Sequence, residues 1–181
     1  MSYGWIIRIK QTILRIISIS KILITDEAIE KVPLIRYKEI QESEYLMLQE
    51  LAKEVLTISK NDNQSNEVAL TYSLDYRNLI TTSLECIVIV LHNHPSLSKF
   101  SLEDVKFFLN NGTVKMMVVV TNLGSISYLV KKDRYQRKKA VELYNRAVSL
   151  HNEGNSIHDY QKAVTYFLSN CHDADIVYED R

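Results

Sequence analysis

The feature that most constrains the fold is a short apolar run that ends abruptly at two histidines and a proline. Residues 86–91 are Cys-Ile-Val-Ile-Val-Leu, a run rich in β-branched side chains. Such a run is typical of a strand buried in the centre of a sheet. His92-Asn93-His94 follows it, and Pro95 ends the strand because proline lacks the N–H that a sheet requires. The sequence therefore predicts a central strand with two histidines at its carboxyl end.

Stretches typical of helix and of strand follow one another along the rest of the chain. In chain order we expect a helix at 42–60, a strand at 67–74, the central strand, a short helix begun by Ser101, strands at 114–121 and 125–130, and two helices after Arg134. Helices and strands are thus interspersed without a regular repeat. This order predicts an α+β fold, a mixed β-sheet flanked by helices, with helical additions at both ends.

The one-residue spacing of the histidines has a geometric consequence. Alternate residues of a strand point to the same side, so His92 and His94 project together while Asn93 points away. Asp104 lies in the first turn of the helix that Ser101 begins, where its carboxylate can reach the same point. Two histidines and one carboxylate, with a fourth position left for water, form the pattern of catalytic zinc. The alternative is that Ser101 and Asp104 only cap the helix and favour its dipole.

The same residues carry a family resemblance. His92-Asn93-His94-Pro95-Ser96, followed by Ser101-x-x-Asp104, resembles the JAMM motif of JAB/MPN metallopeptidases, His-x-His-Pro…Ser-x-x-Asp. The opening is particularly similar to bacterial RadC-like members. The stretches at 100–104 and 118–124 are similar to JAB-like domains of phage head-morphogenesis proteins and toxin-like proteins. The resemblance covers about residues 30–131 and implies the JAB/MPN fold, which is cytidine-deaminase-like.

The resemblance implies a role for each matching residue. His92, His94 and Asp104 would be the ligands of Zn²⁺. Ser101 would hydrogen-bond the zinc-bound water or stabilise the tetrahedral oxyanion. The implied activity is that of a zinc-dependent metallopeptidase, an enzyme in which metal-activated water attacks a peptide or isopeptide bond of a peptide or protein substrate.

The family's general base is a glutamate on an earlier strand, and Glu67 is the matching candidate. Glu54 lies in a helical pattern and Glu85 lies on the histidine strand, so both fit less well. The alternative for Glu67 is a solvated charge at a strand edge.

Two departures from the family pattern concern spacing. Six residues separate His94 from Ser101, where seven or more are usual, so the loop between them must be tighter. The segment 75–85 is too short for the helix found there in larger members. A substrate-binding insertion would then be reduced or absent, which argues against recognition of ubiquitin-like substrates.

Three other functions compete with the peptidase. One is a structural or interaction module with a JAB-like fold in a phage or toxin-system protein. Another is Fe(II) oxygenase chemistry, which two histidines and one carboxylate also support, although His151, His158 and His172 all lie in the helical tail. The third is a nuclease, which the contiguous His-Asn-His triplet does not favour.

The chain is expected to have three parts. These are an N-terminal amphipathic helical segment (1–29), a JAB/MPN-like metal-binding domain (30–131) and a C-terminal helical extension (132–181). Residues 5–24 are rich in isoleucine, but four Lys or Arg residues interrupt them, so we expect no transmembrane segment. A helix packed on the domain is favoured there over a basic helix lying on a membrane surface.

The composition limits which binding partners and which cellular compartment we expect. Lys+Arg and Asp+Glu are equal at 22 each, so no overall positive field attracts a nucleic-acid backbone. The basic cluster at 131–139 is interpreted as a solvated helix start. Two isolated cysteines give neither a disulfide framework nor a thiolate zinc site. This usage suits a reducing compartment, and we expect a cytoplasmic protein.

Overall fold

A computed structural model describes residues 21–37, 42–74, 87–154 and 157–181. Its sheet has five strands in the order β1-β2-β3-β4-β5, so strands that are consecutive in the described chain are neighbours in the sheet. The strands are β1 (Ala69–Leu74), β2 (Ile87–His94), β3 (Val114–Thr121), β4 (Ile126–Lys131) and β5 (Ile176–Asp180). The helices are α1 (Asp26–Glu30), α2 (Glu42–Asp62), α3 (Leu102–Asn110), α4 (Arg137–Gly154), α5 (Ile157–Asn170) and a 3₁₀ turn, η1 (Cys171–Ala174).

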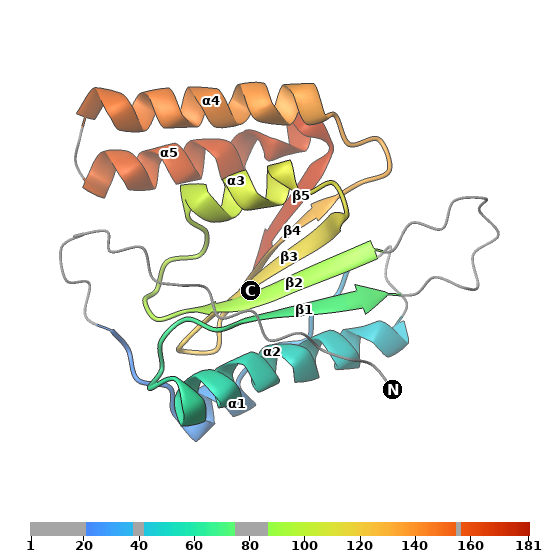
Figure 1. Cartoon of the computed structure of the whole chain (residues 1–181), viewed down its shortest axis with the longest axis vertical. Helices are drawn as coiled ribbons and strands as arrows, with labels where there is room; N and C mark the ends of the chain where they lie inside the picture. Colours follow the sequence, from blue (N-terminus) through green and yellow to red (C-terminus); the bar gives the residue numbers. More distant parts are fainter. Residues whose placement is uncertain (1–20, 38–41, 75–86, 155–156) are drawn as a thin grey trace.

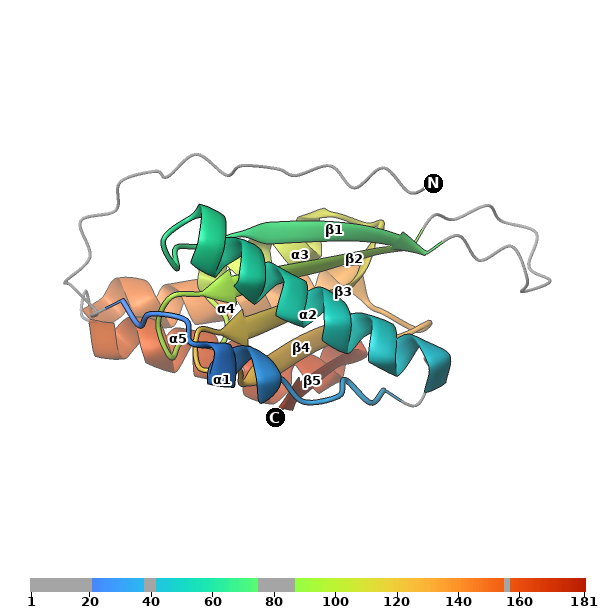
Figure 2. The same ribbon diagram turned by 90° about the horizontal axis from the view of Figure 1, so that it is seen from below.

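Helices cover both faces of the sheet (Figure 1). Helices α3, α4 and α5 lie over one face, and α1 and α2 lie over the other, as the view from below also shows (Figure 2). Each face has its own buried core. Alternate residues of β2 divide between them: Val90 packs in the core under α3–α5, and Ile89 and Leu91 pack in the core under α1 and α2. His92 and His94 continue the Val90 side of the strand.

The sheet is mixed, because β2 and β3 are parallel while the other neighbouring pairs are antiparallel. Helix α3 is the connection between the two parallel strands, which is what a parallel pair requires. The predicted α+β class, a mixed sheet flanked by helices, is therefore confirmed. The more specific JAB/MPN fold stays a prediction.

The predicted elements agree with the structure to within a few residues at each end. The strand expected at 114–121 is β3, and Ser101 is the N-cap of α3. Strand β5 is an addition, because the sequence pattern predicts helices alone after Arg134. It pairs antiparallel with β4 and so places the end of the chain on the sheet.

Two sequence predictions lie partly or wholly outside the described residues. These are the amphipathic N-terminal segment, of which residues 21–29 are described, and the short segment at 75–85. Within the described ranges, no helix is both long enough and apolar enough to cross a membrane. The division into three parts stays a prediction.

Lys131 is buried, although the basic cluster to which it belongs is expected to be solvated. Its side chain leaves β4 and donates from Nζ to the carbonyl oxygens of Phe108 (2.6 Å) and Asn111 (2.7 Å) at the end of α3. Burial, with smaller contributions from Arg137 and Lys115, lowers its pKa to about 8. The interpretation as a solvated residue is therefore wrong for Lys131, whose ammonium group instead caps the carbonyl end of α3.

The turn between β3 and β4 depends on Gly124. Its φ is +88°, and a Cβ there would meet the carbonyl oxygen of Ala28 at 2.3 Å. Any larger residue would push this turn away from α1. The turn matters for the site because Asn122, which it carries, donates its backbone N–H to the carbonyl oxygen of His94.

Candidate metal centre

The two histidines lie side by side at the carboxyl end of β2. Both residues are buried, with 4% of His92 and 6% of His94 exposed. Their Nε2 atoms are 3.0 Å apart. This distance suits two nitrogens that share a proton or that bind one cation. The predicted projection of both imidazoles to one side is confirmed.

The Asp104 carboxylate faces both histidines, one oxygen toward each ring. Its Oδ1 is 3.2 Å from Nε2 of His92, and its Oδ2 is 3.3 Å from Nε2 of His94. Ligands at about 2.0–2.1 Å from a tetrahedral zinc ion are separated by roughly 3.3 Å. The three distances, 3.0, 3.2 and 3.3 Å, are close to that spacing, although the two distances to Asp104 run from its two different oxygens.

A capping box holds Asp104 in place. The Ser101 hydroxyl accepts the backbone N–H of Asp104 at 3.0 Å, and Oδ2 of Asp104 accepts the backbone N–H of Ser101 at 2.7 Å. This reciprocal pair fixes the first turn of α3 and the direction of the carboxylate. The contacts of Ser101 described here are those of a helix cap, and its role toward a water or an oxyanion stays a prediction.

Ser98, which is not part of the motif, orients the ring of His94. Nδ1 of His94 is 2.9 Å from the Ser98 carbonyl oxygen and 3.1 Å from its hydroxyl. A carbonyl oxygen only accepts, so Nδ1 carries a proton, and in the neutral ring the lone pair is on Nε2. Metal-binding histidines are held by a hydrogen bond of this kind.

Glu67 approaches the same point from the neighbouring strand. A carboxylate oxygen of Glu67 and a ring nitrogen of each histidine all lie within 4.8 Å of one another, so Glu67, His92 and His94 form a group that could hold a metal ion. The register explains the approach, because Ala69 pairs with His92 and Glu67 lies two residues before it. Glu67 is exposed, unlike the histidines. It can therefore serve as a fourth ligand or as a base acting on a water.

Asn93 anchors the segment that carries Glu67. It is completely buried, on the side of β2 opposite the histidines. Its Oδ1 accepts the N–H of Val68 at 2.7 Å, and its own N–H donates to the Val68 carbonyl oxygen at 3.1 Å. Its Nδ2 donates to Oδ1 of Asn122 (2.8 Å) and to the Ser59 hydroxyl (3.1 Å). One amide thus joins β2 to α2, to the β3–β4 turn and to the residue that follows Glu67.

The charges of the cluster depend on one another. Burial alone would raise the pKa of Asp104, but attraction and hydrogen bonds to His92 and His94 hold it well below its usual range. Burial alone would lower the pKa of His94, but the hydrogen bond and charge of Asp104 raise it, helped by Glu67 and by the Ser98 carbonyl group. Asp104 is therefore ionised at neutral pH, and His94 holds a proton more strongly than a free histidine.

This coupling predicts how the stability of chelator-treated protein depends on pH. The pKa of His94 is raised on folding, so its contribution is full below the unfolded value of about 6.5 and is lost as pH rises through the folded pKa. The pKa of Asp104 is lowered, so its contribution is full above about 3.9 and is lost as pH falls through the folded pKa. Urea unfolding in EDTA should therefore show a loss of stability above pH 6.5. His94→Gln should flatten that loss, and an identical profile in this variant would contradict the assignment.

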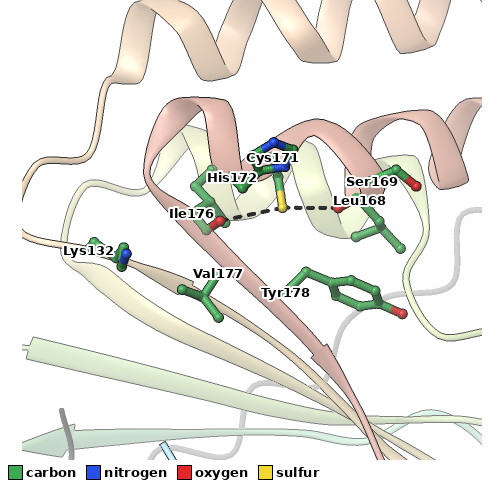
Figure 3. Close-up of a pocket in the computed structure, with 8 residues that line it drawn as sticks. All are labelled: Lys132, Leu168, Ser169, Cys171, His172, Ile176, Val177 and Tyr178. Atoms are coloured by element: carbon green, nitrogen blue, oxygen red, sulfur yellow. Dashed lines mark hydrogen bonds between the residues drawn. The ribbon is translucent and has the colours of Figure 1, made fainter. Parts of the chain in front are cut away.

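A separate hollow of about 320 Å³ lies between the end of α5, η1 and β5 (Figure 3). Its lining includes Cys171, whose Sγ lies 3.2 Å from the Leu168 carbonyl oxygen and 3.6 Å from that of Ile176. Burial raises the pKa of Cys171 to about 11, so the thiol is protonated at neutral pH and a poor nucleophile. The hollow shares no lining residue with the histidine cluster.

Comparison of the chain with protein-family models, with curated proteins and with solved structures gives no match in any of the three. The sequence motif and the geometry of the cluster are therefore what indicate a function. The observation of greatest weight is that the two histidine rings meet the carboxylates of Asp104 and Glu67.

Proposed function

We propose that this chain is a zinc-dependent, metallopeptidase-like hydrolase of the JAB/MPN type. The observation that carries the proposal is the convergence of the two histidine Nε2 atoms, the Asp104 carboxylate and the Glu67 carboxylate on one point. The mixed sheet, with the histidines on β2 and the aspartate on the following helix, supports the JAB/MPN type. The chemistry is assigned to one site formed by residues of β2, α3 and the segment before β1.

The donor set favours zinc. Two imidazole nitrogens and one carboxylate, with one position left open, are the ligands of many catalytic zinc sites, although Fe(II) uses the same set. Asp104 is held ionised and His94 presents Nε2, so both are prepared to bind a cation. Zinc bound there would lower the pKa of a water molecule and polarise the carbonyl group of the substrate.

Glu67 would act as the general base and then as the general acid of the hydrolysis. Its carboxylate accepts a proton from the attacking water while the water oxygen bonds to the carbonyl carbon of the substrate. The C–N bond then breaks, and Glu67 returns the proton to the nitrogen of the leaving amine. Its exposure lets it reach both water and substrate, which the buried histidines cannot do. The choice of a peptide or isopeptide bond rests on the resemblance of the motif.

Metal binding tests the centre directly. Purified wild-type protein should contain about one zinc ion per chain by plasma mass spectrometry, since the three ligands define one site. His92→Ala should weaken zinc affinity, measured by competition with a chromophoric chelator, by more than about 100-fold. That exceeds the 10–100-fold that loss of an outer-shell partner typically costs.

His172→Ala is the matched control, because its side chain is 73% exposed in η1 and takes no part in the cluster. It should bind zinc as the wild type does. Stoichiometric iron in place of zinc would favour oxygenase chemistry. A wild-type chain that binds no divalent metal would contradict the proposal and favour a structural module with a JAB-like fold.

A further inference from the structure

A tyrosine from the C-terminal helices contacts the first turn of α3, which carries Asp104. The Tyr160 hydroxyl accepts the backbone N–H of Leu102 at 2.9 Å and donates to Oε2 of Glu103 at 2.7 Å. Tyr160 belongs to α5 and lies 58 positions after Leu102 in the chain. Its ring packs edge-on against His151 of α4, with ring centroids 5.2 Å apart. It is therefore held from both C-terminal helices, which lie beside α3 (Figure 1).

The Tyr160 hydroxyl contacts the first turn of α3, which carries Asp104 of the cluster. The first N–H groups of a helix have no partner within the helix and need acceptors from outside it. Ser101 supplies the acceptor for Asp104, and Tyr160 supplies the acceptor for Leu102. The capping box thus stabilises the first turn from within α3, and the Tyr160 hydroxyl binds the same turn from α5. Without the phenol, the turn would keep its capping box but lose its hydrogen bonds to α5.

Two further contacts tie the preceding loop to the last strand. Lys99 forms an ion pair with Asp180, and the ring of Phe100 packs edge-on against Tyr178 with centroids 6.3 Å apart. Both partners belong to β5. Residues 99–103 are therefore attached to the C-terminal region at three separate points, directly before Asp104.

We propose that Tyr160 is a positioning residue for the metal centre, holding the first turn of α3 so that Asp104 meets His92 and His94. The inference rests on the proposed function only in taking Asp104 as a metal ligand. It makes the C-terminal helices part of the site, although they contribute no ligand. Catalytic ligands need to be held to within about half an ångström, and a turn at the start of a short helix needs outside support to reach that precision.

Tyr160→Phe tests the inference, because it removes the hydroxyl and keeps the ring. We expect zinc affinity to fall by about 10–100-fold, the usual effect of losing an outer-shell contact. In the cobalt-substituted protein, the visible d–d bands should shift or lose intensity, because they report the positions of the ligands. A merely structural role would lower stability in urea without changing the cobalt spectrum.

Tyr166→Phe is the matched control, since Tyr166 lies on the same helix and packs against the core. It should leave both zinc affinity and the cobalt spectrum unchanged. Glu103→Gln provides a second test that preserves packing, and it should change the spectrum in the same direction by a smaller amount. Wild-type affinity and spectrum in both Tyr160→Phe and Glu103→Gln would overturn the inference while leaving the metal centre intact. Failure of the wild type to bind metal would instead contradict the proposed function.

Discussion

Glu67→Gln is expected to bind zinc as the wild type does and to lose hydrolytic activity by about 10²–10⁴-fold, the usual contribution of a general base. The substitution keeps the size of the side chain and removes its ability to accept a proton. Glu67 lies beside the histidines, but the contacts of Asp104 with His92 and His94 do not involve it, so these three residues remain as ligands. Cleavage of a fluorescence-quenched peptide library, with zinc content measured on the same sample, would separate the two effects.

Glu54→Gln is the control for this experiment. Glu54 is an exposed carboxylate of α2 in the same part of the sequence. Its substitution should leave cleavage unchanged. If Glu67→Gln loses zinc together with activity, Glu67 is a fourth ligand and not the base. If it retains full activity against peptides that the wild type cleaves, the assigned proton transfers are wrong.

Asn93→Ala is expected to reduce the free energy of unfolding by about 3–5 kcal/mol, since each buried polar group left without a partner costs about 1–3 kcal/mol. The Val68 N–H and Oδ1 of Asn122 would both lose their bonds to this side chain. The loss should be visible as a lower midpoint in urea unfolding at unchanged slope. Any folded fraction should also show reduced activity, because the segment that carries Glu67 would no longer be attached to β2.

Asn145→Ala makes the same chemical change at an exposed position of α4. It should change stability by no more than about 0.5 kcal/mol, as is usual for surface substitutions. If Asn93→Ala loses no more unfolding free energy than this control, the hydrogen bonds of the Asn93 amide are not what holds β2 to α2 and to the β3–β4 turn.

Local pattern was sufficient to predict most of the elements that form the cluster. The β-branched run before His92 and the proline after His94 define the end of β2, and the alternation of a strand places both rings on one side. The capping signal of Ser101 defines the start of α3, which places Asp104 in its first turn. Each of these inferences uses residues that are close in the sequence, where spacing translates directly into geometry.

The contacts that support the cluster could not be predicted in this way. Tyr160 meets α3 from a distant helix, and neither sequence segment carries a signal for the other. Lys131 is buried because the carbonyl end of α3 lies next to β4 and accepts hydrogen bonds from its ammonium group. This tertiary contact cannot be predicted from the charge of the residue. Strand β5 is short, and its pairing with the edge of β4 is a tertiary contact that the local sequence does not signal. Ser98 follows His94 by four residues, and a search for an acceptor near each histidine could have found it.

The sequential strand order has a consequence for how this protein is made. A growing chain emerges from the ribosome amino end first, and here each new strand joins the one completed before it. Glu67, His92, His94 and Asp104 are all synthesised before β3, yet α3 is fastened by contacts from α5 and β5. A nascent chain that has not yet reached α5 would thus contain every ligand but lack the contacts that position Asp104. Metal binding at full affinity should therefore require that α5 and β5 have been synthesised and folded.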